Sequence, residues 1–142
     1  MFVVIVGSGR VGSAIARKML ADGHEVSVLD EDPEAIAQLE KGMEDSWVDA
    51  GGSFTVGTAL EIDALLAAGI ERADAFVAAT DGDNTNLVIA QIAQKHFEVP
   101  KVVVRVMDPA RAEWYEQQGL RTVCPTKIAI EMLGEAVHEG MA

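Results

Sequence analysis

The sequence predicts an α/β fold with a doubly wound, parallel, six-stranded sheet in the order 3-2-1-4-5-6 and helices on both faces. Short apolar runs alternate with helical patterns six times along the 142 residues. The runs lack the in–out alternation of half-exposed strands, as is typical of parallel sheets covered on both faces. Right-handed crossovers then make this strand order the simplest one. A composition of 49% hydrophobic but only 5% aromatic residues also favours an aliphatic α/β core over a β-sandwich.

The chain opens on an apolar strand that leads directly into a glycine-rich turn. Residues 2–6 are apolar, and Gly7-x-Gly9-x-x-Gly12 follows at once, with a helical pattern starting inside it. In this context the first glycine permits the tight turn, the second lets the backbone approach a pyrophosphate, and the third lets helix and strand pack closely. The free N–H groups at the helix start form an anion site. An ordinary strand–turn–helix with chance glycines is the alternative.

The second strand, residues 24–30, ends in an acidic side chain. Asp30 stands 18 residues after Gly12, where a carboxylate can accept both hydroxyls of an adenosine ribose and repels a 2′-phosphate. Glu31 and Asp32 add to that repulsion, so we expect NADP to be disfavoured. Strand, glycines and acid together indicate a Rossmann-like unit that binds an adenine nucleotide.

Turn residues and apolar spacing place the other elements. Asp32-Pro33 opens a helix that ends at Gly42, since Asp suits the N-cap and proline suits the first helical position. The segment 43–56 gives one short third strand ending at Val56, and Trp47-Val48 is a strand-like piece before the Gly51-Gly52 turn. In the second half of the chain we expect strands over 75–79, 101–106 and 122–124. Helices are expected over 61–68, from the end of a polar loop at 80–84 to near 99, from 108 to about 118, and over about 126–138. We expect residues 1–142 to form a single domain.

In a sheet of this order the ligand crevice lies at the carboxyl ends of the strands, between the first and fourth strands. The segments that meet there are 7–12, 30–32, 57–59 and 80–84. In the last of these, Asp and Asn residues (Asp81, Asp83, Asn84 and Asn86) precede a helix, which indicates either a cation site or caps of that helix. We favour caps and expect no metal ion.

Several classes of function are excluded by composition and motifs. A net charge of −12 repels nucleic acid phosphates and anionic lipid headgroups. No apolar run reaches the ~20 residues that a bilayer requires, so direct membrane insertion is not expected. The single cysteine, Cys124, is interpreted as a core residue. No histidine stands at the carboxyl end of a strand, and no nucleophile or Walker-type motif occurs. We therefore expect binding without catalysis.

The whole chain resembles an RCK N-terminal domain, also called a KTN or TrkA-N domain. The motifs that carry the resemblance are Gly-x-Gly-Arg-Val-Gly at 7–12, Gly23-His24-Glu25-Val26, Asp30, Gly57-x-Ala59, Leu65-Leu66-x-x-Gly69-Ile70, Ala73-Asp74-Ala75, Thr80-Asp81-x-Asp83-x-x-Asn86-Leu87, Arg105-Val106-x-Asp108-Pro109, Gly119 and Val123-x-Pro125. Such domains are cytoplasmic nucleotide-binding regulators of prokaryotic potassium channels and transporters.

The resemblance implies that the chain binds NAD(H), ADP or ATP and regulates a membrane-embedded potassium transporter or channel subunit. It assigns Arg10 to the phosphates, with a solvated arginine as the alternative, Asp30 to the ribose, and Thr80 and Asp81 to the loop beside the nucleotide. The full set of expected cofactor-binding residues is Gly7, Ser8, Gly9, Arg10, Val11, Gly12, Asp30, Glu31, Gly57, Thr58, Ala59, Thr80, Asp81 and Arg105.

The chain departs from the family pattern at three points. Thr58 stands where the family usually has an acid near the adenine, which affects base selectivity. Thr126 replaces the glutamate that often follows Pro125, which weakens the case for sensing ATP with a metal. The C-terminal regulatory domain that often follows is absent from this sequence, so the chain is either a stand-alone form or ends before that domain.

The final helix predicts self-association. Residues 126–138 carry more apolar positions than one face of a terminal helix needs, and such a helix is expected to be buried on several sides. In the resembling family this helix crosses to a partner lobe, so we expect a homodimer or larger homo-oligomer at the cytoplasmic side of the membrane. The alternative function is the cofactor-binding part of an NAD-dependent oxidoreductase whose catalytic residues lie on another chain.

Overall fold

The structure, a computed structural model, describes residues 1–141 and contains one all-parallel sheet. Its six strands run in the order β3-β2-β1-β4-β5-β6, which confirms the predicted doubly wound topology. The strands are β1 Phe2–Val6, β2 Glu25–Asp30, β3 Ser53–Val56, β4 Ala75–Ala78, β5 Lys101–Arg105 and β6 Arg121–Val123.

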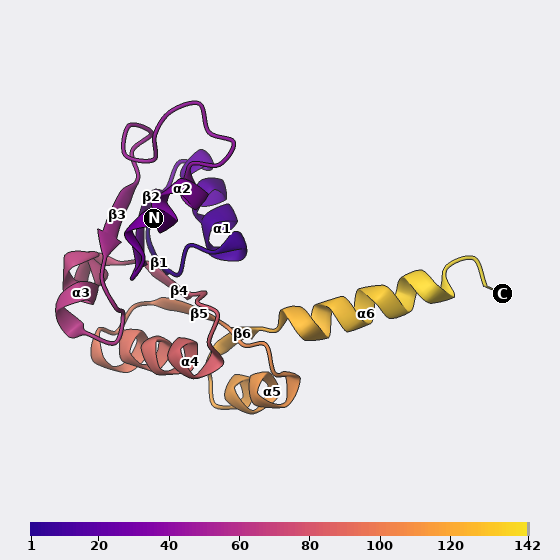
Figure 1. Ribbon diagram of the computed structural model, residues 1–142. Coiled ribbons are helices and arrows are strands. Elements are labelled where there is room, and N and C mark those ends of the chain that lie inside the picture. The colour runs from indigo at the N-terminus through magenta and orange to yellow at the C-terminus, as the bar shows by residue number, and fades with distance from the viewer. Residues whose placement is uncertain (142) are drawn as a thin grey trace.

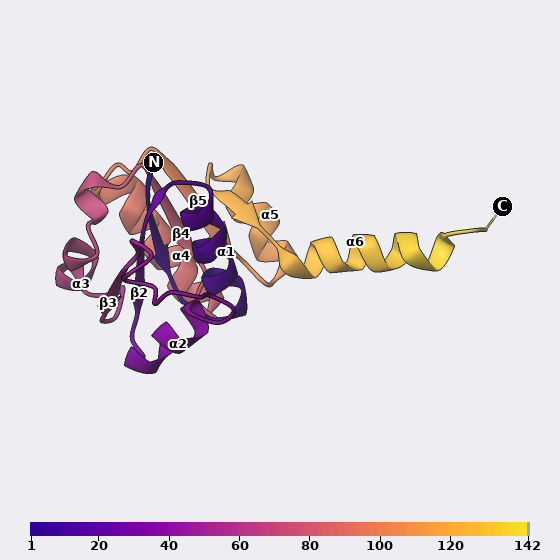
Figure 2. The ribbon, with the colours of Figure 1, turned by 90° about the horizontal axis from the view of Figure 1, so that it is seen from above.

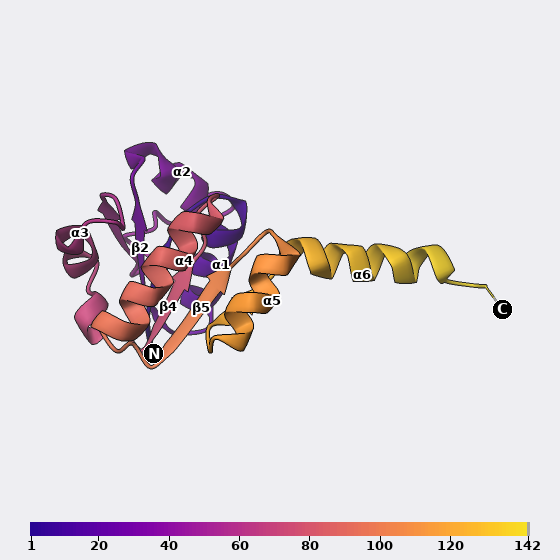
Figure 3. The ribbon, with the colours of Figure 1, turned by 90° about the horizontal axis from the view of Figure 1, so that it is seen from below.

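Helices cover both faces of the sheet. The α-helices are α1 Arg10–Ala21, α2 Ile36–Leu39, α3 Ile62–Ala67, α4 Asp83–Gln91, α5 Pro109–Gln117 and α6 Pro125–His138. Two short 3-10 helices, η1 Pro33–Ala35 and η2 Ile70–Arg72, and a π-helical segment that continues α4, η3 Ile92–His96, complete the set. Helix α1 lies in front of the sheet when it is seen from above, and α4 and α5 lie in front when it is seen from below (Figures 2 and 3). The predicted Asp32 cap is present, because its carboxylate accepts a hydrogen bond from Glu34 N at 2.9 Å.

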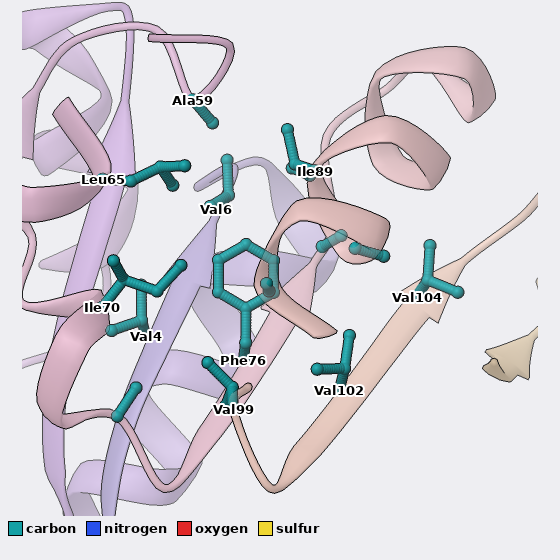
Figure 4. Close-up of a cluster of buried hydrophobic side chains, with 14 of the residues drawn as sticks. Val4, Val6, Ala59, Leu65, Ile70, Phe76, Ile89, Val99, Val102 and Val104 are labelled. Carbon is teal, nitrogen blue, oxygen red and sulfur yellow. The ribbon is translucent and has the colours of Figure 1, made fainter. Parts of the chain in front are cut away.

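The larger core cluster lies between the sheet and the layer formed by α3, α4 and α5. Phe76 of β4 is fully buried at its centre, between Val4 of β1 and Val102 of β5 (Figure 4). A fully buried aromatic ring contributes more apolar area than any neighbouring valine or alanine, so this ring joins the central strands to the helices above them.

The strand-like interpretation of Trp47-Val48 is wrong. Both residues lie in a turn region between α2 and β3, and the strand itself is only Ser53–Val56. Trp47 is nevertheless fully buried: its ring packs in the cluster under α1 and α2, and its Nε1 donates to Ser53 O at 2.9 Å. A lone aromatic residue can therefore anchor a loop to the core without belonging to a strand.

The outer edge of β6 is held by a carboxylate. Glu116 of α5 accepts hydrogen bonds from both the backbone N and the Oγ1 of Thr122, each at 2.7 Å. The backbone hydrogen bond from Thr122 is the main cause that lowers the pKa of Glu116 below its ordinary value. These bonds connect α5 to the edge strand just before the chain enters α6.

Helix α6 projects away from the body of the domain (Figure 1). None of its residues is buried, and Ile130, Leu133 and Val137 are exposed by 62%, 67% and 73%. Within residues 1–141, no helix has both the length and the apolar character that crossing a bilayer would require.

Gly52 tests the packing of the Trp47 loop. A Cβ added at Gly52 would lie 2.1 Å from Cε2 of the buried ring, so Gly52→Ala should lower the free energy of unfolding by about 1–3 kcal/mol through overpacking. Chemical unfolding followed by fluorescence measures this. Gly134→Ala is the control, because an added Cβ in α6 meets nothing within 4 Å. Equal stabilities of the two variants would contradict the packing assignment.

Candidate functional site

A crevice of about 320 Å³ opens at the carboxyl edge of the sheet, where the strand order reverses between β1 and β4. Nine residues predicted for the site line it, namely Gly7, Gly9, Asp30, Glu31, Gly57, Thr58, Ala59, Thr80 and Asp81. Six further lining residues are absent from the predicted set of site residues, although Gly82 lies in the predicted segment 80–84. They are Val6, Leu29, Leu60, Ala79, Gly82 and Thr85. The remaining predicted residues, Ser8, Arg10, Val11, Gly12 and Arg105, do not line it.

The three glycines of the first turn have different roles. Gly7 adopts φ +96°, and a Cβ there would lie 2.6 Å from the carbonyl oxygen of Ala79. A Cβ at Gly12 would lie 1.8 Å from the carbonyl oxygen of Gly7, so these two glycines are required by backbone packing. At Gly9 an added Cβ meets nothing within 4 Å, and this residue lines the crevice. Gly9 therefore leaves open the space that a ligand would need.

The Asp30 carboxylate is held in place from two sides. Its Oδ2 accepts from the Ser8 backbone N at 2.9 Å and from Ser8 Oγ at 3.1 Å, and its Oδ1 accepts from Asp32 N at 2.9 Å. A carboxylate offers about four acceptor positions, so one remains, on Oδ1. A ribose hydroxyl could donate to this position. Ser8 thus contributes through Asp30 although it does not line the crevice.

The two predicted arginines lie outside the crevice. Arg10 is the exposed first residue of α1. The Arg105 side chain is 15% exposed beneath the Thr80 loop, where its Nη2 donates to Thr80 O and lies 3.4 Å from Asp81 Oδ1. Among residues 1–141, its Nε is the one buried side-chain nitrogen or oxygen atom that has no hydrogen-bond partner.

Asn86, which the predicted set of site residues omitted, fixes the loop on the β4 side of the crevice. It is fully buried, its Oδ1 accepts from Thr80 N at 2.9 Å and Thr80 Oγ1 at 2.6 Å, and its Nδ2 donates to Thr80 O and Arg105 O, both at 3.0 Å. The position of an asparagine six residues after Thr80, inside an apolar helical pattern, was the available signal.

The interpretation of the acidic loop as helix caps is wrong. Gly82 is the N-cap of α4, and no side chain caps it. The Asp83 carboxylate instead accepts from Met107 N at 2.7 Å and from Asp108 N at 3.0 Å. The loop is therefore tied to the turn between β5 and α5. Within residues 1–141, no group of three or more His, Cys, Asp or Glu side chains is arranged to hold a metal ion.

Three features together define a Rossmann-type α/β domain of the nucleotide-binding class. They are the order of the strands, the glycine-rich turn after β1, and the crevice at the point where the strand order reverses. Residues 3–126 match the family model of the TrkA-N domain, and the chain belongs to this family.

The chain is similar in sequence to potassium uptake proteins. It is 39% identical over 141 residues to the Trk system potassium uptake protein TrkA of Streptomyces coelicolor, covering 99% of this chain and 60% of that protein. It is 30% identical over 138 residues to the TrkA homolog of Methanothermobacter thermautotrophicus, covering 96% of this chain and again 60% of the relative. The chain thus spans about 60% of the length of these relatives.

Solved structures share the fold. The Kef C-terminal domain of Shewanella denitrificans in an AMP-bound form has a TM-score of 0.77 and 30% identity, covering 96% of this chain and 80% of that one. The TrkA-N domain of the Escherichia coli inner membrane protein ybaL has a TM-score of 0.80, with 95% of each chain covered. At 17% identity the latter similarity shows the fold alone.

The role of Asn86 can be measured by unfolding. Asn86→Leu fills the site with an apolar side chain of similar size and leaves Thr80 N and Arg105 O without this partner. A loss of about 1–3 kcal/mol in the free energy of unfolding is therefore expected. Asn84→Ala is the matched control, because the exposed Asn84 side chain accepts one hydrogen bond, from half-buried Arg111 at 2.7 Å. The loss of stability in this variant should stay within about 0.5 kcal/mol. Similar losses in both variants would show that Asn86 does not anchor the loop.

Proposed function

We propose that this chain senses an adenine nucleotide as the regulatory subunit or domain of a potassium transport system. The ligand is NAD(H) or an adenosine mono-, di- or triphosphate, and NADP is disfavoured by Asp30 and its acidic neighbours Glu31 and Asp32. The proposal extends the function of the relatives named above, which are potassium uptake proteins, to a chain that covers about 60% of their length.

The observation that carries the nucleotide assignment is the open space at Gly9 beside a fixed Asp30. The start of α1 offers free backbone N–H groups next to that space, and a diphosphate would be favoured there by those groups and by the helix dipole. Asp30 with Ser8 would then bind the ribose, and the segment Gly57–Leu60 would lie beside the base. The AMP-bound form of the Shewanella domain, 30% identical to this chain, supports the same class of ligand.

Gly9→Val tests this assignment directly. Gly9 has an extended backbone at the N-cap of α1, with φ −71° and ψ −159°, which valine can adopt. The variant should therefore fold with nearly unchanged stability, but its side chain would occupy the phosphate space, so calorimetry should detect no binding of NADH or ADP. Full affinity in a folded Gly9→Val protein would mean that the phosphates lie elsewhere. Gly12→Ala is the contrasting variant, since its Cβ would meet Gly7 O at 1.8 Å and should disrupt the fold.

The partner in this proposal is a membrane-embedded potassium transporter or channel subunit, with the chain on its cytoplasmic side. A regulatory domain must convert occupancy of the crevice into a movement that the pore subunit can detect. Two lobes joined as a symmetric pair can do this, because a ligand-dependent change in the angle between them displaces both attached pore segments.

Helix α6 supports assembly as a homodimer or larger homo-oligomer. Around its axis the apolar residues, which include Ile128, Ile130, Met132, Leu133 and Val137, occupy more than half of the circumference, and every one of them is exposed. A helix that is apolar over so wide an arc is stable when several sides are covered. A second copy of this chain supplies an equivalent apolar helix, and a two-fold axis would bring the pair together.

Light scattering tests the assembly. The wild-type chain should be a dimer or larger at micromolar concentration, and Leu133→Glu should shift it towards monomer by burying a charge in the proposed contact. Glu135→Gln, on the polar side of the same helix, should leave the oligomeric state unchanged. A wild-type chain that stays monomeric at micromolar concentration would remove the basis for a paired-lobe mechanism.

A further inference from the structure

The lining of the crevice is acidic at both ends. Asp30 and Glu31 stand at the β2 end and Asp81 at the β4 end, and the lining residues include no lysine, arginine or histidine. Arg10 and Arg105 do not line the crevice, and Arg105 lies beneath the Thr80 loop, from which its Nη2 reaches Asp81 at 3.4 Å. The charge of a ligand should therefore influence its affinity.

Asp81 differs from Asp30 in how firmly its carboxylate is held. Asp30 accepts three hydrogen bonds from Ser8 and Asp32, and these fix its carboxylate. The Asp81 side chain is fully exposed, and its one contact is Arg105 Nη2 at 3.4 Å, a nitrogen that already donates to Thr80 O. The Asp81 carboxylate is thus held less firmly than that of Asp30.

The geometry sets which part of a ligand would meet Asp81. With the adenosine at the β2–β3 end and the first two phosphates at the start of α1, any further group must extend towards the β4 end. There it would lie beside Asp81, Gly82 and Thr85. A third phosphate would bring additional negative charge to Asp81, whereas a nicotinamide nucleoside brings none and, when oxidised, brings a positive ring.

We propose that Asp81 is a specificity-determining residue that disfavours a third phosphate and favours a dinucleotide whose far end is neutral or cationic. This inference rests on the proposed function of the crevice as a nucleotide site. It predicts the relative affinities of the ligands named in the proposed function: NAD⁺ and NADH should bind more tightly than ATP. The physical cause is the Coulomb energy between the carboxylate and the group beyond the diphosphate.

The test is calorimetry on the full chain with NAD⁺, NADH, ADP and ATP, in a chelator so that no metal bridges the phosphates. Asp81→Asn should strengthen ATP binding by about three- to tenfold, the effect of removing one charge a few ångströms from another in water. It should weaken NAD⁺ binding and change ADP binding less than ATP binding. Because an exposed charge is screened, these differences should shrink as the salt concentration rises.

Two control variants distinguish an effect of the charge at residue 81 from an effect of the net charge of the protein and from a general loss of ligand binding. Glu71→Gln removes an exposed carboxylate from η2, before β4, at the opposite edge of the sheet from the crevice, and should leave all four affinities unchanged. Asp30→Ala should weaken all ligands together. The inference would be overturned if Asp81→Asn left the ratios between the affinities for the four ligands the same as in the wild type. It would also be overturned if the wild type bound ATP more tightly than NADH. A wild type that binds none of them would instead refute the proposed function, and the inference with it.

Discussion

The structure depends on a backbone-to-backbone contact at the first turn. Gly7 and Gly12 lie so close together, and Gly7 so close to Ala79, that a single carbon atom at either glycine would overlap a main-chain oxygen. Gly7 N also donates to Leu29 O at 2.9 Å, and Ala79 N donates to Val6 O at 2.9 Å. This contact brings the ends of β1, β2 and β4 together, and those ends form the walls of the crevice.

Local chemistry made the central part of the fold and most of the crevice predictable. Continuous apolar runs identified the strands, and Asp30 at the end of β2 identified one wall, because parallel strands end at a common edge. The Trp47 turn was not predictable, since its apolar character reflects a tertiary contact with α1 and α2 and not a strand. The role of Asp83 was missed for a similar reason: its partners, Met107 and Asp108, are distant in sequence.

The same limit applies to the side chains around the crevice. Arg10 and Arg105 were assigned to the site from their place in a motif, but the direction of a side chain is set by its neighbours in space. Arg105 lies under the Thr80 loop, and the Asn86 side chain forms hydrogen bonds with the backbone of both Thr80 and Arg105. Asp83 and Asn86 together join the crevice loop to the end of β5 and the start of α5, while Glu116 joins α5 to β6. Successive polar contacts thus connect the crevice with the strand that leads into α6.

The different roles of the three glycines have an evolutionary consequence. Selection for a stable fold acts on Gly7 and Gly12 in any descendant of this chain, whatever that descendant binds. Gly9 faces open space, so folding places little constraint on it, and only a ligand would keep its side chain absent. In a lineage that had ceased to bind nucleotide, Gly9 would be free to drift while the other two glycines persisted. The identity of this one residue would then record the loss of the ligand in a domain whose fold had not changed.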